Sequence, residues 1–510
     1  MHRHMVRTGP ARRELIVLSG VAAVVVGAHL AVVHQYGIFR DELYYLACGR
    51  HLAWGYVDHP PVVAVLARIS SWFGNSLLAI RIISILLSGV LVFIVGAIVR
   101  RLGGGAFAQG VGAVLVSFAP HFLFVFHILS MNSAEVTLWA LCAWLLLVAL
   151  GCDRAWPWIG FGVAAGIGLL TKHSMGVFGV GVLAGLLLTR HRRVLRSPWP
   201  WIAGAIAALL LAPHLVWQAA HDWPTREFVE NAQRYKIAKQ SPASFLAEVV
   251  LMMGPVTAPV WLVGWWSLLR GYFGPHGRVL GWAAAVVVGV FVFQQSKPYY
   301  VTPMWPVLLA SGAVVLERAT ASRKGLRLAS VTLLIAGAGA LAPFTLPLLP
   351  VEKYVAYSRA LGVTPNSQER QTLGTLPQHY ADMHGWEELA RTVSAVYRQL
   401  PDHEKASARV LARNYGEAGA LEYFADRYAL PRVISPHNNY WYWGPGPDGG
   451  TLIIIGGTRE DHEDAFERLE EAGRTECSYC MPYENGNPIW IGRGWKVPLN
   501  QIWREERRFI

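Results

Sequence analysis

Charged residues are scarce in this chain. Asp, Glu, Lys and Arg make up only 15% of its 510 residues, whereas hydrophobic residues make up 53% and Trp occurs 21 times. Soluble domains of this length rarely carry so little charge. Up to position 349 the apolar residues gather in blocks of about 16 to 24, which is long enough to cross a bilayer as helices. The sequence therefore predicts a mostly α-helical, polytopic membrane protein.

Other features are also missing. The sequence has no evident internal repeat and no low-complexity linker. No small-residue cleavage site follows the basic stretch MHRHMVRTGPARRE, so we expect an uncleaved first span rather than a signal peptide. The net charge of +12 does not require nucleic acid as a partner, because Lys and Arg of membrane proteins gather in cytoplasmic loops.

The apolar blocks predict about eleven transmembrane helices. We place them at 15–34, 77–99, 106–126, 133–151, 156–171, 174–189, 200–218, 246–269, 279–295, 300–316 and 328–348. With a cytoplasmic N-terminus, the inside loops hold most of the basic clusters, among them RHRRVLRS at 190–197. The same alternation places 35–76, 127–132, 172–173, 219–245, 296–298 and the tail from 350 outside the cytoplasm. We therefore expect a transmembrane domain at 1–349 of a cell-membrane protein, and an extracytoplasmic domain at 350–510.

The tail has the composition of an ordinary globular domain. ARVLARN and TLIIIG predict strands, and YGEAGALEYFADRYAL and REDHEDAFERLEEAG predict helices, so the tail is expected to be a small α/β domain. Cys477 and Cys480 form a CxxC, but a second CxxC is missing, so a local disulfide is at least as well supported as a zinc ribbon.

Polar residues interrupt the first outer loop, FRDELYYLACGRHLAWGYVDHPP at 39–61. Asp41 and Glu42 are adjacent, and Asp58 and His59 precede two prolines. Ionised carboxylates near a membrane are costly unless they pair, bind a metal or do chemistry. One of them can act as a general base towards a hydroxyl. The alternatives are a wet surface helix for the first pair and a plain turn for the second.

Further polar residues lie at the same predicted membrane face. Glu135 follows Asn132 near the start of a span, where an acid also favours the helix dipole. Lys172-His173 and Lys297, the latter followed by Tyr299 and Tyr300, lie in outer turns. A cation there suggests an anionic ligand such as phosphate, and snorkelling to lipid headgroups is the alternative.

Taken in order, these segments resemble the bacterial branch of the dolichyl-phosphate-mannose–protein mannosyltransferase family, which includes the lipid A aminoarabinose transferases. The first loop is similar to the family's first-loop segment, FHILSMNSAEVTLWALCAWLLL to its second-loop segment and GLLTKHSMGVFG to its Lys-bearing turn. HLVWQAAHDWPTREFVEN and QQSKPYYVTPMWPVLLASG follow. NYGEAGALEYF and HNNYW resemble the tail of one bacterial subgroup.

The resemblance implies a C-type glycosyltransferase fold with an outward-facing site. Such enzymes move a sugar from a polyprenyl-phosphate carrier to an extracytoplasmic acceptor with inversion. The family's proposed base falls on Asp41, and Glu42 is its neighbour. The second-loop acid falls in the region of Asn132 and Glu135, of which we favour Glu135. The acceptor class stays open among glycolipid, wall polymer and protein, and a transporter or flippase of lipid-linked sugars is the alternative function.

The resemblance also implies a donor-phosphate site. Lys172 and Lys297 match family positions near the carrier phosphate, and Asp58 and His59 match an acid and a basic residue of the first-loop motif. In the aminoarabinose transferases the basic position is lysine. We expect no required cofactor, and we leave open a divalent metal with Asp58 and His59 as its ligands. The residues expected at the donor phosphate are His59, Lys172, His173, Lys297, Tyr299 and Tyr300.

Overall fold

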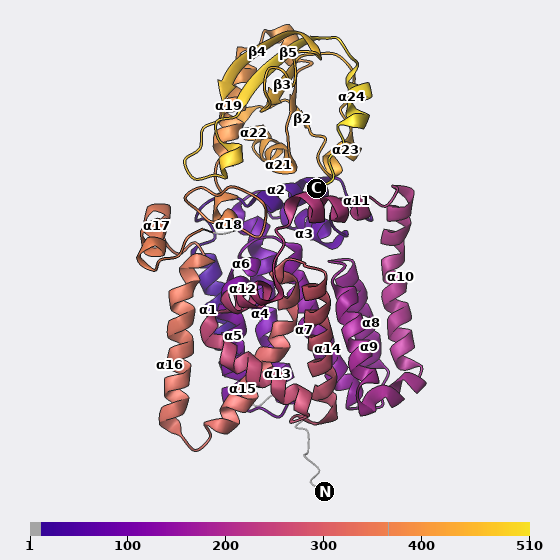
Figure 1. Ribbon diagram of the computed structural model, residues 1–510, viewed down its shortest axis with the longest axis vertical. Coiled ribbons are helices and arrows are strands. Elements are labelled where there is room, and N and C mark those ends of the chain that lie inside the picture. The colour runs from indigo at the N-terminus through magenta and orange to yellow at the C-terminus, as the bar shows by residue number, and fades with distance from the viewer. Residues whose placement is uncertain (1–11, 366) are drawn as a thin grey trace. The chain divides into compact units, whose positions relative to one another are not determined.

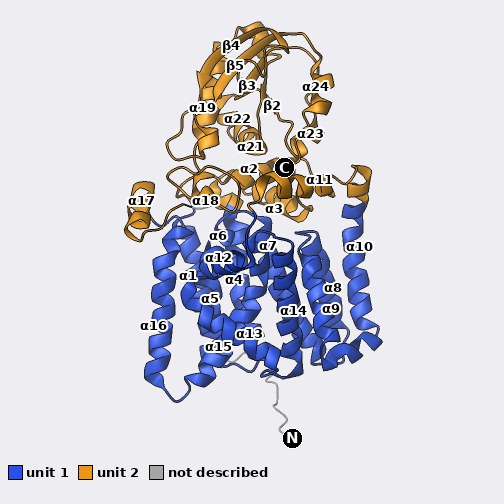
Figure 2. Cartoon of the chain, viewed as in Figure 1, with its two compact units in different colours: residues 1–33, 81–215, 239–348 blue, residues 34–80, 216–238, 349–510 orange. Residues whose placement is uncertain are grey.

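The computed structural model describes residues 12–365 and 367–510, so the basic stretch at residues 1–11 lies outside the described residues. The chain forms two compact units (Figure 2). Unit 1 comprises the chain up to Val33, Arg81–Leu215 and Lys239–Leu348. Unit 2 comprises His34–Ile80, Val216–Ala238 and Leu349–Ile510. Two segments between the apolar helices therefore pack with the tail.

From Arg12 onward, the regular elements of unit 1 are all helices (Figure 1). Its helices are α1 (Arg12–Ala31), α4 (Leu77–Arg101), α5 (Ala106–Phe118), α6 (Pro120–His127), α7 (Met131–Leu150), α8 (Trp156–Leu169), α9 (Met175–Leu187), η1 (Arg190–Arg196), α10 (Trp199–Ala220), α12 (Pro242–Met253), η3 (Pro255–Thr257), α13 (Ala258–Arg270), α14 (Gly274–Phe293), η4 (Pro298–Met304), α15 (Trp305–Ala319), α16 (Lys324–Leu341) and η5 (Ala342–Phe344). The first residues of α4 and the last of α10 belong to unit 2.

Within the described chain, seven helices are long and apolar enough to cross a membrane. Two bent pairs raise the number to nine: α5 with α6, bent by 65°, and α12 with the helix after it, bent by 95°. The prediction of a polytopic membrane protein is confirmed, but the count of eleven is not reached. The two remaining predicted spans correspond to α8 and α9, which have 14 and 13 residues and fall short of the usual spanning length.

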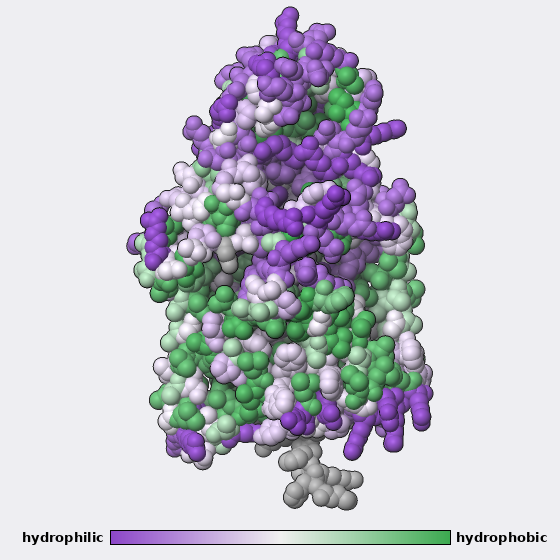
Figure 3. Space-filling view, in the orientation of Figure 1, coloured by the Kyte–Doolittle hydropathy of each residue, from purple (hydrophilic) through white to green (hydrophobic). Residues whose placement is uncertain are grey.

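The long helices differ in how much of their apolar surface is buried, so some lie in the interior of unit 1 and others at its surface. In α7 and in Pro298–Ala319, 78% of the apolar window is buried, whereas in α16 only 6% is buried. An apolar helix with so little buried surface suits a lipid environment. Figure 3 accordingly shows hydrophobic side chains gathered over the helices of unit 1 and hydrophilic side chains over unit 2.

Small residues allow the central helices of unit 1 to approach closely. A Cβ on Gly264 of α13 would meet the backbone of Leu308 and Gly312 in α15, and a Cβ on Gly312 would meet the backbone of Val260. Helices in membranes pack through such small residues because lipid is as apolar as the side chains and gives no hydrophobic drive. These contacts fix α15, which follows the segment that carries Tyr299 and Tyr300.

Unit 2 combines short helices with one mixed sheet. Its helices are α2 (Arg40–Arg50), α3 (Val62–Ser71), α11 (Pro224–Asn231), η2 (Ala232–Lys236), α17 (Val351–Ala360), α18 (Gln378–Ala381), α19 (Trp386–Gln399), α20 (Asp402–Lys405), α21 (Tyr415–Tyr423), α22 (Ala425–Tyr428), α23 (Asn439–Trp443), η6 (Pro482–Glu484) and α24 (Leu499–Glu505). Its strands are β1 (Arg409–Leu411), β2 (Arg432–Ile434), β3 (Leu452–Ile455), β4 (Phe466–Arg474) and β5 (Pro488–Trp495).

The sheet has the strand order β2-β1-β3-β5-β4. β1 pairs in parallel with β2 and β3, whereas β5 pairs antiparallel with β3 and β4. Ile434, Ile454, Phe466, Trp490 and Trp503 belong to one apolar cluster at the sheet. The predicted small α/β domain is therefore present as a mixed α/β sheet domain.

The helix predicted over REDHEDAFERLEEAG is wrong, because Phe466–Arg474 forms the edge strand β4. Glu, Leu and Ala favour helix by less than about 1 kcal/mol each. That preference is outweighed by pairing along β5, from Phe466 opposite Trp495 to Arg474 opposite Pro488, and by burial of Phe466. The charged residues of β4 suit an edge strand, since they discourage further strand pairing.

We expect Phe466→Ala to loosen the edge of the sheet. Phe466 is buried against Trp495, with ring centroids 4.6 Å apart, and such truncations cost about 3 to 5 kcal/mol. Amide hydrogen exchange of the whole protein should show faster exchange in β4 and β5. Glu467→Ala, at an exposed position of the same strand, should leave exchange unchanged. Unaltered protection in the Phe466 variant would contradict the strand assignment.

Candidate active site

The first-loop acids lie at the start of α2. Phe39 is extended and precedes the helix, and its N–H donates to Glu42 Oε2 at 2.8 Å. Glu42 is fully buried. An acid at the third helical position that accepts from the residue before the helix stabilises the helix start. Glu42 therefore has a structural role here, whereas the neighbouring Asp41 is partly exposed.

Asp41 and Asp58 each accept a hydrogen bond from a tyrosine. Tyr415 donates from its hydroxyl to Asp41 Oδ1 at 2.9 Å, and Tyr44 donates to Asp58 Oδ1 at 2.9 Å. The rings of Tyr44 and Tyr415 lie 4.7 Å apart, centroid to centroid. We name these four residues the carboxylate–tyrosine cluster. Its members come from α2, from the turn before α3 and from α21, so three parts of unit 2 converge on it.

The two acids of the cluster lie in different electrostatic environments. Burial raises the pKa of Asp58, and the nearby Asp41 carboxylate raises it further, while His59 and the Tyr44 hydrogen bond lower it. Asp41 lies in the first turn of α2, where the helix dipole favours a carboxylate. Paired acids in different environments are a common basis for acid–base chemistry.

Residues of the tail hold the two tyrosines. The side-chain oxygen of Asn439 accepts from Val57 N at 2.7 Å and lies 3.3 Å from the Tyr44 hydroxyl. His437 Nδ1 accepts from Tyr415 N at 3.0 Å, and the His437 ring stacks on Tyr415. Burial lowers the pKa of His437 to about 3, so this imidazole is neutral. HNNYW thus forms a buried support for the cluster.

Arg40 places a cation behind Tyr415. Its guanidinium carbon lies 4.6 Å from the centre of the Tyr415 ring, and its Nη1 donates to the Tyr483 hydroxyl at 2.9 Å. A guanidinium over an aromatic face is a favourable arrangement, more so when it is buried. Arg40 is nearly fully buried, so it fixes the Tyr415 ring that contacts Asp41.

His59 is completely buried and surrounded by aromatic rings. Its ring stacks on Tyr56 at 4.7 Å and meets Tyr44 and Tyr45 edge-on. Its Nδ1 lies 2.9 Å from the carbonyl oxygen of Pro60, and its Nε2 lies 4.0 Å from Asp58 Oδ1. This geometry suits a residue that positions Asp58 more than one that meets a phosphate.

A metal held by Asp58 and His59 would have few protein ligands. Within residues 12–365 and 367–510, no group of three or more His, Cys, Asp and Glu side chains is placed to hold a metal ion. Catalytic zinc sites generally use three protein ligands. Two candidate ligands, one of them sealed by tyrosines, do not fit such a site, and no step is assigned to a metal.

Unit 1 holds a separate polar group around Lys172. Lys172 Nζ donates to Asn132 Oδ1 at 2.8 Å and to Glu135 Oε2 at 3.1 Å. The ammonium also lies over the rings of Tyr300, at 4.3 Å, and Tyr299, at 4.8 Å. We name these five residues the lysine cluster. The Glu135 carboxylate is buried and also accepts from the Ser174 hydroxyl.

Local structure explains why these side chains meet. Ser130 caps α7 by accepting from Asn132 N at 3.0 Å, which places Asn132 and Glu135 on the first turns of the helix. Lys172 and Ser174 lie in the short turn between α8 and α9, and Tyr299 and Tyr300 lie in η4. His173 is exposed, with its Nε2 3.0 Å from Nε2 of His214. Lys297 is partly exposed at the residue before η4.

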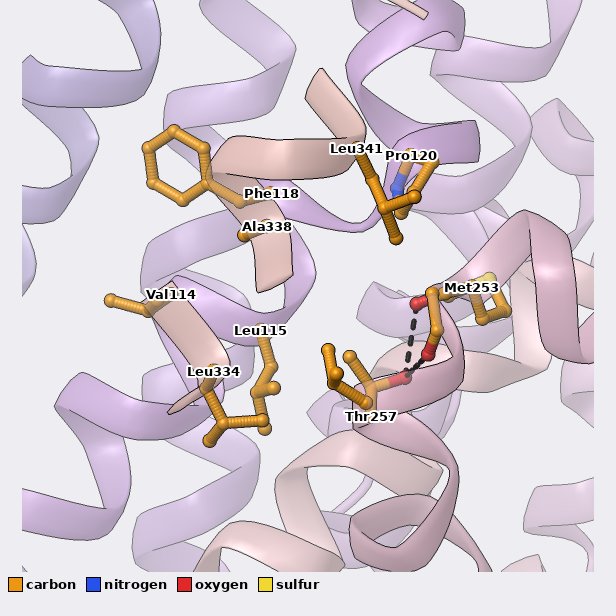
Figure 4. Close-up of a pocket in the computed structure, with 11 residues that line it drawn as sticks. Val114, Leu115, Phe118, Pro120, Met253, Thr257, Leu334, Ala338 and Leu341 are labelled. Carbon is orange, nitrogen blue, oxygen red and sulfur yellow. Dashed lines mark hydrogen bonds between the residues drawn. The ribbon is translucent and has the colours of Figure 1, made fainter. Parts of the chain in front are cut away.

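An apolar pocket lies at the breaks of both bent helix pairs (Figure 4). The space between its lining atoms, including the part that is open to the surroundings, is about 280 Å³. Phe118 and Pro120 flank one break, and Met253 and Thr257 flank the other. Figure 4 shows Leu334, Ala338 and Leu341 of α16 at the pocket, and the Thr257 hydroxyl bonds the backbone of its own turn. The pocket wall is therefore almost entirely hydrocarbon.

Several residues of the two clusters were absent from the expected site. Tyr44, Tyr415, Asn439 and Arg40 all contribute to the carboxylate–tyrosine cluster. Each of these residues lies within a segment that resembles the family (RDELYY, NYGEAG or HNNYW). That resemblance is the only feature of the sequence that could have identified them as site residues. Which side chains face the acids depends on contacts between segments hundreds of residues apart, and spacing does not encode those contacts.

The fold is similar to that of C-type glycosyltransferases. ArnT from Cupriavidus metallidurans, solved in the apo state and bound to undecaprenyl phosphate, matches with a TM-score of 0.62 and 15% identity over 94% of this chain and 97% of that one. Arabinofuranosyltransferase AftD from Mycobacteria matches with a TM-score of 0.53 and 13% identity over 95% of this chain and 40% of that one. No curated protein sequence matches the chain.

Residues 58–217 match the family model described as dolichyl-phosphate-mannose-protein mannosyltransferase. This segment, which is less than half of the chain, is similar to that family, and the match supports the class of membrane glycosyltransferases that use a sugar linked to a lipid phosphate. The family resemblance expected from the motifs is confirmed, and so is the expected enzyme class. The transporter alternative has no comparable support.

Asp382 allows a test of the electrostatics next to the cluster. Its carbonyl accepts from Arg40 N at 3.0 Å, and its side chain is buried. Burial raises the pKa of Asp382 to about 7, and Asp41 adds to the shift while Arg40 opposes it. Between about pH 4, the ordinary value, and about pH 7, the folded state holds a proton that the unfolded state has lost, so stability falls as pH rises.

We expect Asp382→Asn to remove this dependence. The melting temperature of the wild-type protein should fall, relative to that of the variant, as the pH is raised from 5 to 8. Differential scanning fluorimetry at matched ionic strength measures the melting temperatures of the purified wild-type and variant proteins. An equal pH slope in the two proteins would contradict the protonated state of Asp382.

Proposed function

We propose that the chain is an inverting glycosyltransferase that takes a sugar from a polyprenyl-phosphate carrier and passes it to an acceptor outside the cytoplasm. The lysine cluster carries this proposal. A largely buried ammonium, whose side chain is 12% exposed, lies in an apolar helical unit together with a hydrocarbon-lined pocket. A lipid phosphate needs both environments, one for its charged head and one for its chain.

Lys172 suits a phosphate-binding role. An ammonium has three N–H donors, of which Asn132 and Glu135 each receive one. The third donor is assigned to the carrier phosphate. The charge that builds on the departing phosphate in the transition state strengthens this interaction, which is how a fixed cation accelerates transfer. Glu135, which also accepts from the Ser174 hydroxyl, holds the lysine side chain in one orientation, so Glu135 acts as a positioning residue.

The apolar pocket suits the hydrocarbon chain of the donor. Pro120 at the pocket precedes His121, whose ring stacks on Tyr299 at 5.9 Å, and Tyr299 lies beneath Lys172. Pocket, His121, Tyr299 and Lys172 therefore form a continuous series within unit 1. ArnT, which shares the fold, has been solved with undecaprenyl phosphate bound, and this supports a polyprenyl carrier for the present chain.

Asp41 is proposed as the general base. It is partly exposed in the first turn of α2, and the Tyr415 hydroxyl fixes one of its oxygens. The other oxygen takes the proton of the acceptor hydroxyl as that oxygen bonds to the anomeric carbon and the carbon–phosphate-oxygen bond breaks. Asp58 is assigned a positioning role, because it accepts from the Tyr44 hydroxyl and its Oδ1 lies 4.0 Å from Nε2 of the buried His59.

The loop charges support an orientation with a cytoplasmic N-terminus. Arg190–Arg196 and the basic residues between α15 and α16 lie in loops that alternate with those of Lys172 and Lys297. The positive-inside rule then assigns the N-terminus to the cytoplasm and the tail from 350 to the outside. The acceptor, whether glycolipid, wall polymer or protein, is therefore an envelope component.

We expect Asp41→Asn to abolish transfer without unfolding the protein. The amide oxygen still accepts from Tyr415, but the base is gone, so turnover should fall by about 10²- to 10⁴-fold. Released polyprenyl phosphate is measured with polyprenyl-phosphate sugar and a membrane extract as the source of acceptor. Glu42→Gln is the matched control: its amide oxygen still accepts from Phe39, so turnover should persist. Normal turnover by the Asp41 variant would refute the assignment.

Lys172→Met should weaken the use of the donor. A charge-assisted hydrogen bond contributes about 1.5 to 3 kcal/mol, so kcat/KM for the donor should fall about ten- to a hundredfold. Glu135→Gln keeps a hydrogen-bond acceptor for Lys172 and Ser174 but removes the competing negative charge. This variant should keep its turnover and bind the donor at least as tightly. A loss of turnover in Glu135→Gln as large as that in Asp41→Asn would instead make Glu135 catalytic.

A further inference from the structure

Cys477 and Cys480 lie side by side in a turn after β4, outside the machinery described above. Cys480 N donates to Cys477 Sγ at 3.0 Å, and Cys480 Sγ lies 3.8 Å from the carbonyl oxygen of Cys477. Cys477 is partly exposed and Cys480 is buried. One accessible thiol with a second thiol held behind it is the arrangement that thiol–disulfide exchange requires.

The surroundings of the pair favour a thiolate at Cys477. Gly385 is the residue before α19 and has a φ of +91°, and a Cβ there would lie 2.9 Å from Cys477 Sγ. The sulfur therefore lies against the N-terminus of a 14-residue helix, where a negative charge is favoured. The hydrogen bond from Cys480 lowers the pKa of Cys477 to about 7 and raises that of Cys480.

The pair opens onto a pocket of its own. The pocket has an empty volume of about 250 Å³, and its lining includes His384, Trp386, Thr475 and Glu484 in addition to both cysteines. Because Cys477 is partly exposed, a small thiol or disulfide can reach its sulfur from solvent. No third metal ligand accompanies the two thiols among the described residues.

We propose that Cys477 and Cys480 form a redox-active pair that exchanges with disulfides outside the cytoplasm. Cys477 thiolate attacks one sulfur of the incoming disulfide, and the other sulfur leaves as a thiol. Cys480 then loses its proton and attacks Cys477 Sγ, which releases the second thiol and closes the Cys477–Cys480 bond. Two electrons and two protons pass from the pair to the incoming disulfide.

Oxidation would act on the loop that supports the carboxylate–tyrosine cluster. Cys477 N donates to Asn485 Oδ1 at 2.8 Å, and Thr475 pairs with Gly486 and Asn487 through the backbone. Tyr483, whose hydroxyl accepts from Arg40, lies in the same loop. A bond between residues 477 and 480 reduces the freedom of this loop, so the loop should exchange amide hydrogens more slowly when oxidised. The inference rests on the proposed orientation of the tail but not on transfer itself.

In the test, purified full-length protein is equilibrated with glutathione at several ratios of oxidised to reduced glutathione. Free thiols are then trapped with maleimide, and the labelled peptides are identified by mass spectrometry. In the wild type, the peptide with both cysteines should lose two thiols together with no bound glutathione, while Cys48 and Cys142, both buried, stay reduced. Cys480→Ser should instead hold glutathione on Cys477, and Cys477→Ser should leave Cys480 a free thiol.

Each other outcome counts against the proposal. If both thiols of the wild type remain free with excess oxidised glutathione, the pair is not redox-active. If glutathione stays on wild-type Cys477, Cys480 does not resolve it. Oxidation without slower amide exchange at residues 475–487 would overturn the effect on the loop. Transfer activity is not a readout, so the failure of the proposed function would leave these results unchanged.

Discussion

The hydrogen bond from Tyr415 to Asp41 joins residues 374 positions apart, and the geometry of unit 2 depends on it. Asp41 lies in the first turn of α2 and Tyr415 begins α21, and these two helices pack together. They approach so closely that a Cβ on Gly419 would lie 2.9 Å from Leu43. The partly exposed acid is therefore held from two sides, by its own helix start and by the tail.

The tail supplies much more than one hydroxyl. Asn439 joins Tyr44 to the backbone of Val57, and His437 supports Tyr415 while its other nitrogen lies 2.9 Å from the carbonyl oxygen of Ile510. The last residue of the chain thus contributes to the surroundings of the first loop. The carboxylate–tyrosine cluster forms only when the first loop and the tail are folded together.

Sequence reasoning identified the features that depend on local composition. Hydropathy located every long helix, because a span needs a continuous apolar stretch wherever it lies in the fold. It also isolated Asp41, Glu135 and Lys172, since charge near an apolar helix is conspicuous. It failed for β4, whose helix-favouring residues form a strand because Phe466 is buried and β5 is available for pairing.

The partners of the polar residues were beyond the reach of the sequence for a physical reason. Glu42 and Asp41 are adjacent and chemically alike, yet one accepts from its own backbone and the other from a tyrosine of the tail. The difference arises from the helical phase, which turns successive side chains about 100° apart around the axis. Which acid is buried depends on where the folded chain places a hydrogen-bond donor. The acid that faces away from the buried side remains available to a substrate.

The two clusters also lie in different environments, and these environments suit the roles proposed for them. The lysine cluster lies in the helical unit, where an unpaired charge would be costly and where Glu135 reduces that cost. The carboxylate–tyrosine cluster lies in the unit whose surface is hydrophilic, where a base and a hydroxylated acceptor can both remain hydrated (Figure 3). A lipid-linked donor and a polar acceptor need such different surroundings, so an enzyme that joins them requires both kinds of unit in one chain.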